Sequence, residues 1–410
     1  EHLGRELTAP EQRLEERTLE GIGRVGVVES GPAPVRVVMR PTREAPVQKE
    51  IGQVLHEGFE VQGVEPAALV FGVGREAHGA EQYPWGYVDA MTRTGLPLRS
   101  GAMSDELVTV LRSALLEHYD RTRRDLPWRD DPDPYRIWVS EVMLQQTRVE
   151  TVIPYYRSWL ERFPDVQALA AADADAVLLA WQGLGYYRRA RNLHAGAQIV
   201  CERFGGEMPR TSSELRALPG VGEYTAGALA SIAFEEPVPA IDGNVKRVFA
   251  RLLDDPAPGA AMLREVARTL VDPDRPGDWN QALMDLGATV CTPRRPECGR
   301  CPLARWCGAH AAGSEEDRPA RRSRAEVPKS TRVTAVIVDG SENALVERQP
   351  ENGLLGGLWA FPSVEADPEA GLHDVAIAVA GAAGARLDDD STSVPLAAVR
   401  HRFSHLQATY

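Results

Sequence analysis

Four of the five cysteines have the spacing of metal ligands. Cys291, Cys298, Cys301 and Cys307 are separated by six, two and five residues. Thiolates this close together in sequence can surround one metal centre, either a tetrahedral zinc ion or an iron–sulfur cluster. Zinc modules with four cysteines usually contain two Cys-x2-Cys pairs, and this segment contains one. The spacing therefore favours iron–sulfur and leaves zinc open.

Glu141 has the surroundings of a general acid. It lies in the segment 135–147, a predicted helix with apolar residues on nearly every side of the carboxyl. Burial there would raise the pKa of Glu141, so that it could stay protonated and donate a proton near neutral pH. The alternative, a glutamate on a helix surface, is disfavoured because little else on this helix is charged.

Asp242 has different surroundings. It follows the apolar stretch 238–241 and comes directly before a predicted helix, whose N–H dipoles favour the ionised carboxylate. The alternative is a simple helix N-cap. A neutral acid paired with a charged one is how glycosidic bonds are broken, because the first protonates the leaving group and the second stabilises an oxocarbenium-like sugar.

The stretch 215–248 also predicts a phosphate-binding turn. Leu218–Gly222 reads as a glycine turn after one helix, and the small residues from Thr225 begin the next. Backbone N–H groups at such a turn, beside a positive helix N-terminus, can hold a phosphate. The alternative is an ordinary hairpin of two helices with a glycine cap.

A second glycine turn, at residues 183–185, precedes aromatic and basic residues. Tyr186 could wedge into a stack of bases while the arginines that follow meet phosphate. Core tyrosines and surface arginines are the alternative. The two turns together point to nucleic acid.

Composition sets the outer limits. The net charge of −13 argues at first against a nucleic-acid ligand, but phosphate is met by local patches, and basic residues gather between Arg294 and Arg332. No run of eighteen apolar residues exists, so no membrane association is expected. The charged N-terminal segment has no apolar signal core, and the clustered cysteines are no disulfide framework. We expect a reducing compartment, the cytoplasm, with nucleoid association in a bacterium.

The elements that must position these residues are mainly helical. Apolar residues recur every three or four positions in the segments 106–119, 135–147, 151–163, 174–184, 190–204, 226–234, 244–253, 261–271 and 279–290. These helices predict an all-α domain in two lobes.

The predicted domains are four. Residues 1–102 form a leader of unknown function and uncertain α/β character, with short strands at 23–30, 34–41 and 67–74 and a helix at 48–59. Residues 103–310 form the helical domain, with the cysteine loop at 291–307, and 311–330 form an Arg-rich linker. Residues 331–410 form an α+β domain with a hairpin at 331–349, and we expect this domain to be incomplete.

The motifs together resemble the helix-hairpin-helix DNA glycosylase superfamily, and specifically the MutY-type adenine DNA glycosylases. They are Leu126–Arg129, Trp138–Thr147, Gly183–Leu193, Leu218–Gly227, Asp242–Val248 and the four cysteines. The resemblance covers about residues 104–410. It implies a 4Fe–4S cluster and a truncated Nudix-like C-terminal domain.

The resemblance also implies an activity, the release of adenine paired with 8-oxoguanine or guanine in double-stranded DNA by a monomeric enzyme. It assigns catalysis to Glu141, Asp242, Tyr224 and Asn244, and the adenine pocket to Arg124, Leu126, Trp128 and Arg129. It assigns DNA contacts to Gln146, Tyr186, Gly220, Val221 and Gly222, and contacts with 8-oxoguanine to Phe403, Ser404 and His405.

Two other functions stay open. Relatives that also cut the DNA backbone carry a lysine two residues after the Leu218–Gly222 turn, and this chain has Tyr224 there. Tyr224 therefore indicates a monofunctional glycosylase and argues against an endonuclease III-like enzyme that acts on oxidised pyrimidines. A DNA-binding module without catalysis, holding a structural zinc, is the rival from another class.

Overall fold

The computed structural model describes most of the chain from residue 103 onward and three short N-terminal strands. The described residues are 15–18, 24–28, 36–39, 103–129, 131–320, 326–339, 343–350, 355–366, 371–385, 396, 398–403 and 406–409. They fall into two compact units, one within residues 67–323 and the other within residues 1–66 and 324–410.

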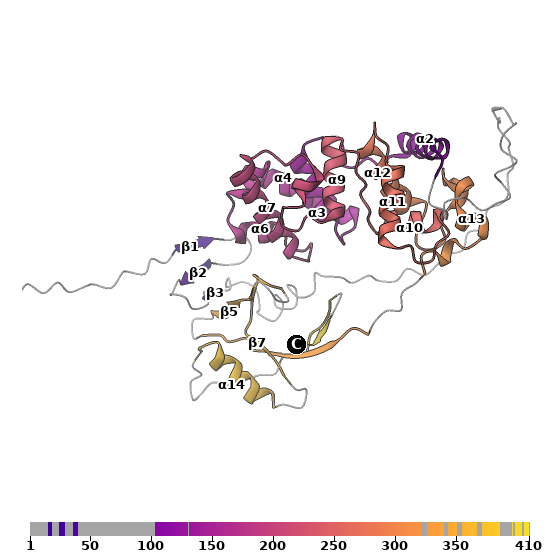
Figure 1. The fold of residues 1–410 in the computed structure, drawn as a ribbon. Helices are drawn as coiled ribbons and strands as arrows, with labels where there is room; N and C mark the ends of the chain where they lie inside the picture. Colours follow the sequence, from indigo (N-terminus) through magenta and orange to yellow (C-terminus); the bar gives the residue numbers. More distant parts are fainter. Residues whose placement is uncertain are drawn as a thin grey trace, which may run out of the picture. The chain divides into compact units, whose positions relative to one another are not determined.

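The first unit is helical and has two lobes (Figure 1). One lobe contains α3 (Pro134–Leu144), α4 (Val149–Arg162), α5 (Val166–Ala170), α6 (Ala174–Ala180) and α7 (Arg188–Phe204). The other contains α2 (Asp105–Thr122), α10 (Gly243–Leu252), α11 (Ala260–Leu270), α12 (Pro276–Thr289) and α13 (Gly308–Ala312). Between them come α8 (Ser212–Leu215) and α9 (Glu223–Phe234), and α9 packs on both α3 and α12. Each helix predicted between residues 103 and 310 overlaps one of these helices.

Large side chains fill each lobe. Trp138, Trp159 and Trp181 are at most 1% exposed, and the last two meet edge to face with ring centres 5.4 Å apart. In the other lobe Phe249 and Trp279 pack with leucines of α2 and α11. Burial of such side chains stabilises the fold by about 2 kcal/mol or more each, so each lobe has a core of its own.

Glycines bring segments of the chain unusually close around the start of α10. A Cβ on Gly227 of α9 would lie 2.3 Å from the carbonyl oxygen of Pro239, and one on Gly287 of α12 would lie 2.6 Å from Cβ of Asn244. Both contacts are too short for any side chain. The chain around Asp242 is therefore held against backbone, with little room to shift.

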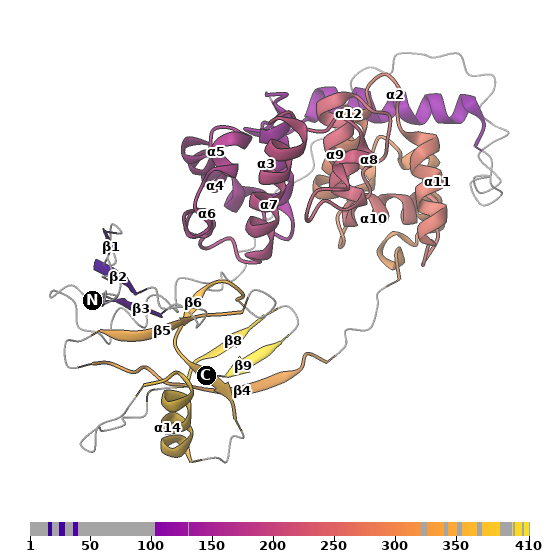
Figure 2. The ribbon, with the colours of Figure 1, turned by 60° about the vertical axis from the view of Figure 1, so that its left-hand side comes forward.

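The described part of the second unit contains two sheets and one helix (Figure 2). The order β1-β2-β3-β5-β6 makes the first sheet and β7-β4-β9-β8 the second, with only the β4–β9 pair parallel among these described strands. The strands are β1 (Glu15–Thr18), β2 (Arg24–Val28), β3 (Arg36–Met39), β4 (Lys329–Thr334), β5 (Ala344–Arg348), β6 (Trp359–Ala360), β7 (Ser363–Glu365), β8 (Arg400–Arg402) and β9 (Gln407–Thr409). The helix α14 (Leu372–Ala382) packs against β4.

Two features of this unit differ from the sequence predictions. The described strands of the predicted leader pair with the C-terminal sheet, since β3 is antiparallel to β5. The predicted hairpin 331–349 is short, because only the bridge Val338–Ala344 joins its arms while β4 pairs with β7 and β9. The predicted strand 67–74 and helix 48–59 lie outside the described residues.

No helix in the described part of the chain is long and apolar enough to cross a membrane.

Candidate active site and cluster loop

Glu141 lies in the last two turns of α3, where that helix packs on α9. It is 6% exposed, and its Oε2 accepts a hydrogen bond of 2.7 Å from the hydroxyl of Tyr224, in the first turn of α9. Burial raises the pKa of Glu141 to about 7, and the negative charge of Asp242 adds to the rise. The Tyr224 hydroxyl opposes the shift, because it donates to the charged form. Glu141 can therefore hold a proton near neutral pH, as predicted.

Asp242 caps the N-terminus of α10. Its Oδ1 accepts from the backbone N–H of Val245 at 2.7 Å, and its Oδ2 accepts from the side-chain amide of Asn244 at 3.0 Å. The N-cap reading of Asp242 is thus correct, and it does not exclude a chemical role. The hydrogen bonds that cap the first turn of α10 also fix the orientation of the Asp242 carboxylate.

The predicted direction of the Asp242 pKa is wrong. The sequence favoured an ionised group stabilised by helix N–H dipoles, which would lower the pKa. The pKa is instead raised, because burial outweighs the donors from Val245 and Asn244 and the positive charge of Arg247. This burial depends on packing between segments that are distant in sequence, since α10 packs against α12.

Asn244 links Asp242 to the cysteine loop. Its side-chain oxygen accepts from Nη2 of Arg247 at 2.8 Å. The same guanidinium donates to the backbone oxygens of Gly287 and Cys291, at 2.7 and 2.8 Å. One continuous path of hydrogen bonds therefore runs from the Asp242 carboxylate to the first residue of the loop.

Arg124 and Arg129, two of the predicted pocket residues, share one carboxylate. Nε of Arg124 and Nη1 of Arg129 donate to Asp285 on α12, at 2.8 and 2.7 Å. Asp285 is 7% exposed, and the two guanidiniums hold its pKa below the usual range despite burial. The charge of Glu141 is among the causes that raise the pKa of Arg129, so this cluster lies within electrostatic range of the acid.

Leu126 and Trp128, the two apolar residues predicted for the pocket, are 5% and 7% exposed. The Trp128 ring meets the ring of Tyr156 edge to face, with centres 5.4 Å apart. Both side chains therefore have fixed positions in the core of the unit rather than on its surface.

The glycine turn is built as predicted. Gly220 has φ +74°, in the left-handed region that glycine adopts without strain, and a Cβ there would meet Asn192. Val221 is buried, and Gly222 caps α9 without a side-chain hydrogen bond. The start of α9 therefore lacks the side-chain cap that α10 has, which suits an external anion.

Gln146 and Tyr186 are both exposed, and both have strained backbones. Their φ values are 60° and 46°, in the left-handed region that residues with side chains rarely adopt. Tyr186 is 47% exposed, and each residue lies in a loop next to one end of a helix. Their exposure fits side chains that meet a ligand.

The residues predicted to contact 8-oxoguanine lie in the second unit. Phe403 follows β8, donates its backbone N–H to the oxygen of Leu406 at 2.7 Å, and its ring meets that of His401. Ser404 and His405 lie outside the described residues.

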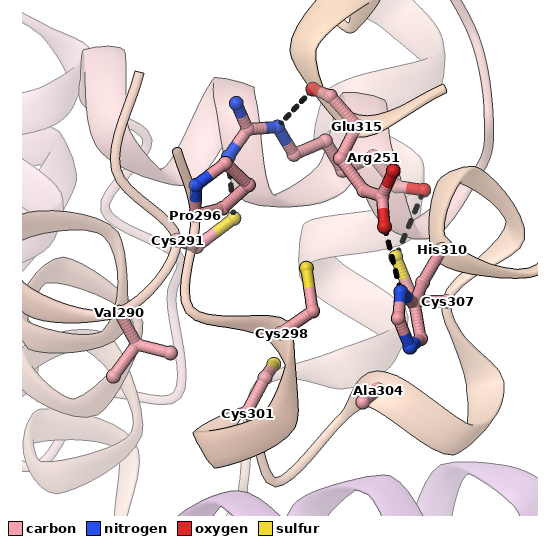
Figure 3. A pocket seen from close by; sticks show the side chains of 10 residues that line it. All are labelled: Arg251, Val290, Cys291, Pro296, Cys298, Cys301, Ala304, Cys307, His310 and Glu315. Atoms are coloured by element: carbon pink, nitrogen blue, oxygen red, sulfur yellow. Dashed lines mark hydrogen bonds and ion pairs between the residues drawn. The ribbon is translucent and has the colours of Figure 1, made fainter. Parts of the chain in front are cut away.

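The four cysteines line one hollow (Figure 3). Arg251, His310 and Glu315 also line it. Arg251 is 2% exposed, donates through Nη1 to the Cys291 sulfur at 3.2 Å, and accepts at its backbone oxygen from the Cys307 thiol. The thiols thus converge from turns of the chain that α10 and α13 hold in place.

Burial raises the pKa of Cys298 to about 11 and of Cys301 to about 12, and it also raises that of Cys307. Thiols packed together in this way are stable as thiolates only when a cation binds them. Four convergent sulfurs, one of which accepts a hydrogen bond from a buried arginine, fit an iron–sulfur cluster.

Sequence reasoning missed Asp285 and Arg247, which position the predicted residues. Asp285 carries the signal that singled out Glu141, because it is an acid among apolar residues on a helix. Arg247 carries no comparable signal, since its partners at Gly287 and Cys291 are about forty residues away.

Comparison with known proteins gives three matches along the chain. Residues 139–273 match the HhH-GPD superfamily of base excision DNA repair proteins, residues 291–307 the iron–sulfur binding domain of endonuclease III, and residues 333–410 the NUDIX domain. A 4Fe–4S cluster therefore belongs to the loop 291–307, and the four cysteines are the residues that would hold it.

Relatives that match most of the chain are also found. The chain is 41% identical to the human adenine DNA glycosylase in an alignment 362 positions long that covers 74% of this chain and 66% of the human protein, so it spans about two thirds of that relative. It is 40% identical to the rat adenine DNA glycosylase in an alignment 365 positions long that covers 74% of this chain and 70% of the rat protein. Among solved structures, a thermostable thymine-DNA glycosylase aligns with 50% of this chain and 97% of its own, at TM-score 0.47 and 30% identity.

Proposed function

The chain belongs to the adenine DNA glycosylase family, and on this premise we propose that it hydrolyses the N-glycosidic bond of adenine paired with 8-oxoguanine or guanine in duplex DNA. That the chain is a DNA glycosylase of base excision repair follows from its relatives and from the HhH-GPD match. The mispair, the reaction steps and the residue roles are our proposal.

Glu141 supplies the proton to the departing base. Its pKa of about 7 leaves a large protonated fraction at neutral pH. The Tyr224 hydroxyl, 2.7 Å from Oε2, fixes the direction of the carboxyl and stabilises the carboxylate that remains after transfer. Protonation makes adenine a better leaving group, so the C–N bond breaks with positive charge left on the sugar.

Asp242 stabilises that sugar cation. Its carboxylate is fixed by Val245 and Asn244, so it need not reorganise as the charge develops. Water then adds to the sugar and completes the hydrolysis. When bound, the cluster holds the four thiolates of the loop together and so stabilises the fold around the path from Cys291 to Asp242.

The DNA is held from several sides. The open start of α9 at Gly220–Gly222 binds a backbone phosphate, and Gln146 and Tyr186 enter the duplex where adenine has left it. Arg124, Leu126, Trp128 and Arg129 surround the extruded adenine. Phe403, Ser404 and His405 of the second unit contact the 8-oxoguanine, and one monomer carries all these parts.

Tyr224 makes the enzyme monofunctional. A lysine at this position would attack the sugar as a Schiff-base nucleophile and lead to strand cleavage. The tyrosine hydroxyl instead donates to Glu141, so no amine is offered at this position.

The observation that carries the proposal is the buried hydrogen bond from Tyr224 to Glu141. With it goes the effect of the Asp242 charge, which raises the pKa of Glu141. The test incubates the protein with a duplex that has adenine opposite 8-oxoguanine, followed by hot alkali. We expect strand scission only after alkali. Scission without alkali would support the endonuclease III-like rival, and binding without any scission would support the non-catalytic module. A duplex with a thymine in place of the adenine is the control.

A further inference from the structure

Arg189 is a buried cation that faces two loops at once. It lies in the first turn of α7 and is 9% exposed. Burial lowers its pKa to about 10. A buried guanidinium is costly unless hydrogen bonds satisfy it, so its acceptors indicate what it is there to hold.

Its first set of acceptors is the loop that carries Gln146. Nη1 donates to the backbone oxygens of Val142 at 3.0 Å and Met143 at 2.8 Å, and also to that of Gln145. Nη2 donates to Oγ1 of Thr147 at 3.2 Å. The cation thus caps the C-terminal end of α3 and binds the residues on both sides of Gln146.

Its second set of contacts is the loop that carries Tyr186. Nη2 donates to the oxygens of Leu184 and Gly185, at 2.9 and 3.2 Å. The guanidinium carbon also lies 5.7 Å from the centre of the Tyr186 ring and 5.1 Å from that of Trp181. Arg189 therefore contacts both the backbone of Gly185 and the ring of Tyr186.

Gln146 and Tyr186 need such support, because each has positive φ without being glycine. Backbones of this kind cost about 1–3 kcal/mol and persist only where the surroundings over-determine them. Arg189 donates hydrogen bonds to both loops, to Gln145 and Thr147 in one and to Gly185 in the other. It therefore links two strained, exposed positions through a planar group that cannot hold one without fixing the other.

We propose that Arg189 is a positioning residue for base extrusion: it holds Gln146 and Tyr186 in the one relative arrangement in which both can enter the duplex. The inference rests on the proposed function, since it assumes that the two side chains act on DNA. A lysine could not replace Arg189, because an ammonium donates from a single point and cannot span both loops.

The test compares Arg189→Met and Arg189→Lys with Arg203→Met, which removes an exposed arginine from the same helix. Each is given adenine opposite 8-oxoguanine, and adenine opposite an abasic site, where no base pair must be broken. Single-turnover rates should fall roughly 100-fold for Arg189→Met on the paired substrate, the size expected for misplaced groups, and only a few-fold on the unpaired one. Arg189→Lys should lie between, and Arg203→Met should match the wild type.

A second readout needs no chemistry. The adenine is replaced by 2-aminopurine, whose fluorescence rises when it leaves the stack, and the wild type should produce this rise while Arg189→Met does not. Melting temperature and the visible absorbance of the cluster check that each variant is folded, and Arg189→Lys serves if the methionine variant is not.

Equal losses on the two substrates, or a full fluorescence rise in Arg189→Met or Arg189→Lys, would overturn the inference. A wild type that extrudes 2-aminopurine but releases no adenine would instead contradict the proposed reaction. The fluorescence comparison would then still decide the role of Arg189.

Discussion

Glu141 and Asp242 are the two carboxyls of the proposed reaction, and they have opposite kinds of structural support. Glu141 lies within α3 and accepts from a single described hydroxyl, on a helix that is distant in sequence. Asp242 begins α10 and accepts from the backbone and from a side chain of its own first turn. One acid is fixed by tertiary packing and the other by local sequence.

The difference teaches what sets each pKa. Burial raises both, but the donors to Asp242 oppose the rise, and the charge of Asp242 raises Glu141 further. Asp242 therefore loses its proton first as pH increases. In the reaction proposed above, release of adenine needs Glu141 protonated and Asp242 ionised, so kcat/KM should fall above a pH of about 7 and also fall at acidic pH.

The strongest test of the comparison is Asp242→Asn. Asparagine also caps helices, so α10 should keep its start, while the negative charge that faces the sugar is lost. We expect adenine release to be abolished and duplex affinity to stay near that of the wild type, as measured by single-turnover excision and by binding to the same duplex. A fully active variant would contradict the role proposed for Asp242.

The next largest effect is expected from Glu141→Gln. The amide can still accept from Tyr224 but cannot donate a carboxyl proton, so the rate should fall by about 10²–10⁴-fold. The pH profile sharpens this test, because the residual rate should lose the fall that the wild type shows above a pH of about 7. A profile unchanged in shape would assign that fall to another group.

Asn244→Ala should change only the acidic limb of the pH profile of kcat/KM. The amide of Asn244 lowers the pKa of Asp242, so its removal should raise that pKa and move the acidic fall in kcat/KM toward neutral pH. The alkaline limb should stay in place. We expect roughly a tenfold loss near neutral pH, in line with one hydrogen bond to a charged group. A shift of the alkaline limb instead would contradict the separation of the two acids.

Tyr224→Phe should have the smallest effect on the rate. It should move the alkaline limb of the pH profile rather than the acidic one. The hydroxyl lowers the pKa of Glu141, so its loss should raise that pKa and extend activity to higher pH, with a fall of a few-fold in rate near neutral pH. Rates measured from acidic to alkaline pH check both parts. An alkaline limb that moves down would show that Tyr224 does more than donate to Glu141.

Sequence reasoning reached the elements and the reactive groups because both are local patterns. The helix of Glu141 and the N-cap of Asp242 were visible as an acid among apolar residues and as an acid before a helix. The predicted direction of the Asp242 pKa shift was wrong because its burial depends on packing with distant segments such as α12. The hairpin predicted at 331–349 is shorter than expected because β4 pairs with β7 and β9, which are distant in sequence.

The positioning residues were harder still to foresee. Asp285 meets Arg124 across 161 positions, and Arg189 meets Gln145 across 44. No periodicity encodes such pairs, and the positive φ of Gln146 and Tyr186 leaves no mark on residue type. What could be predicted was the reactive group, and what could not was the group that orients it.

The helix cap formed by Asp242 also limits how a substrate can reach this acid. A carboxylate has about four acceptor positions, and the N–H groups of Val245 and Asn244 and the Asn244 amide already occupy three of them. Roughly one direction of approach is left open. In the proposed reaction, the side from which the sugar would meet this oxygen is therefore determined by the backbone of α10, and no rotation about the Asp242 side chain can change it while the helix keeps its first turn.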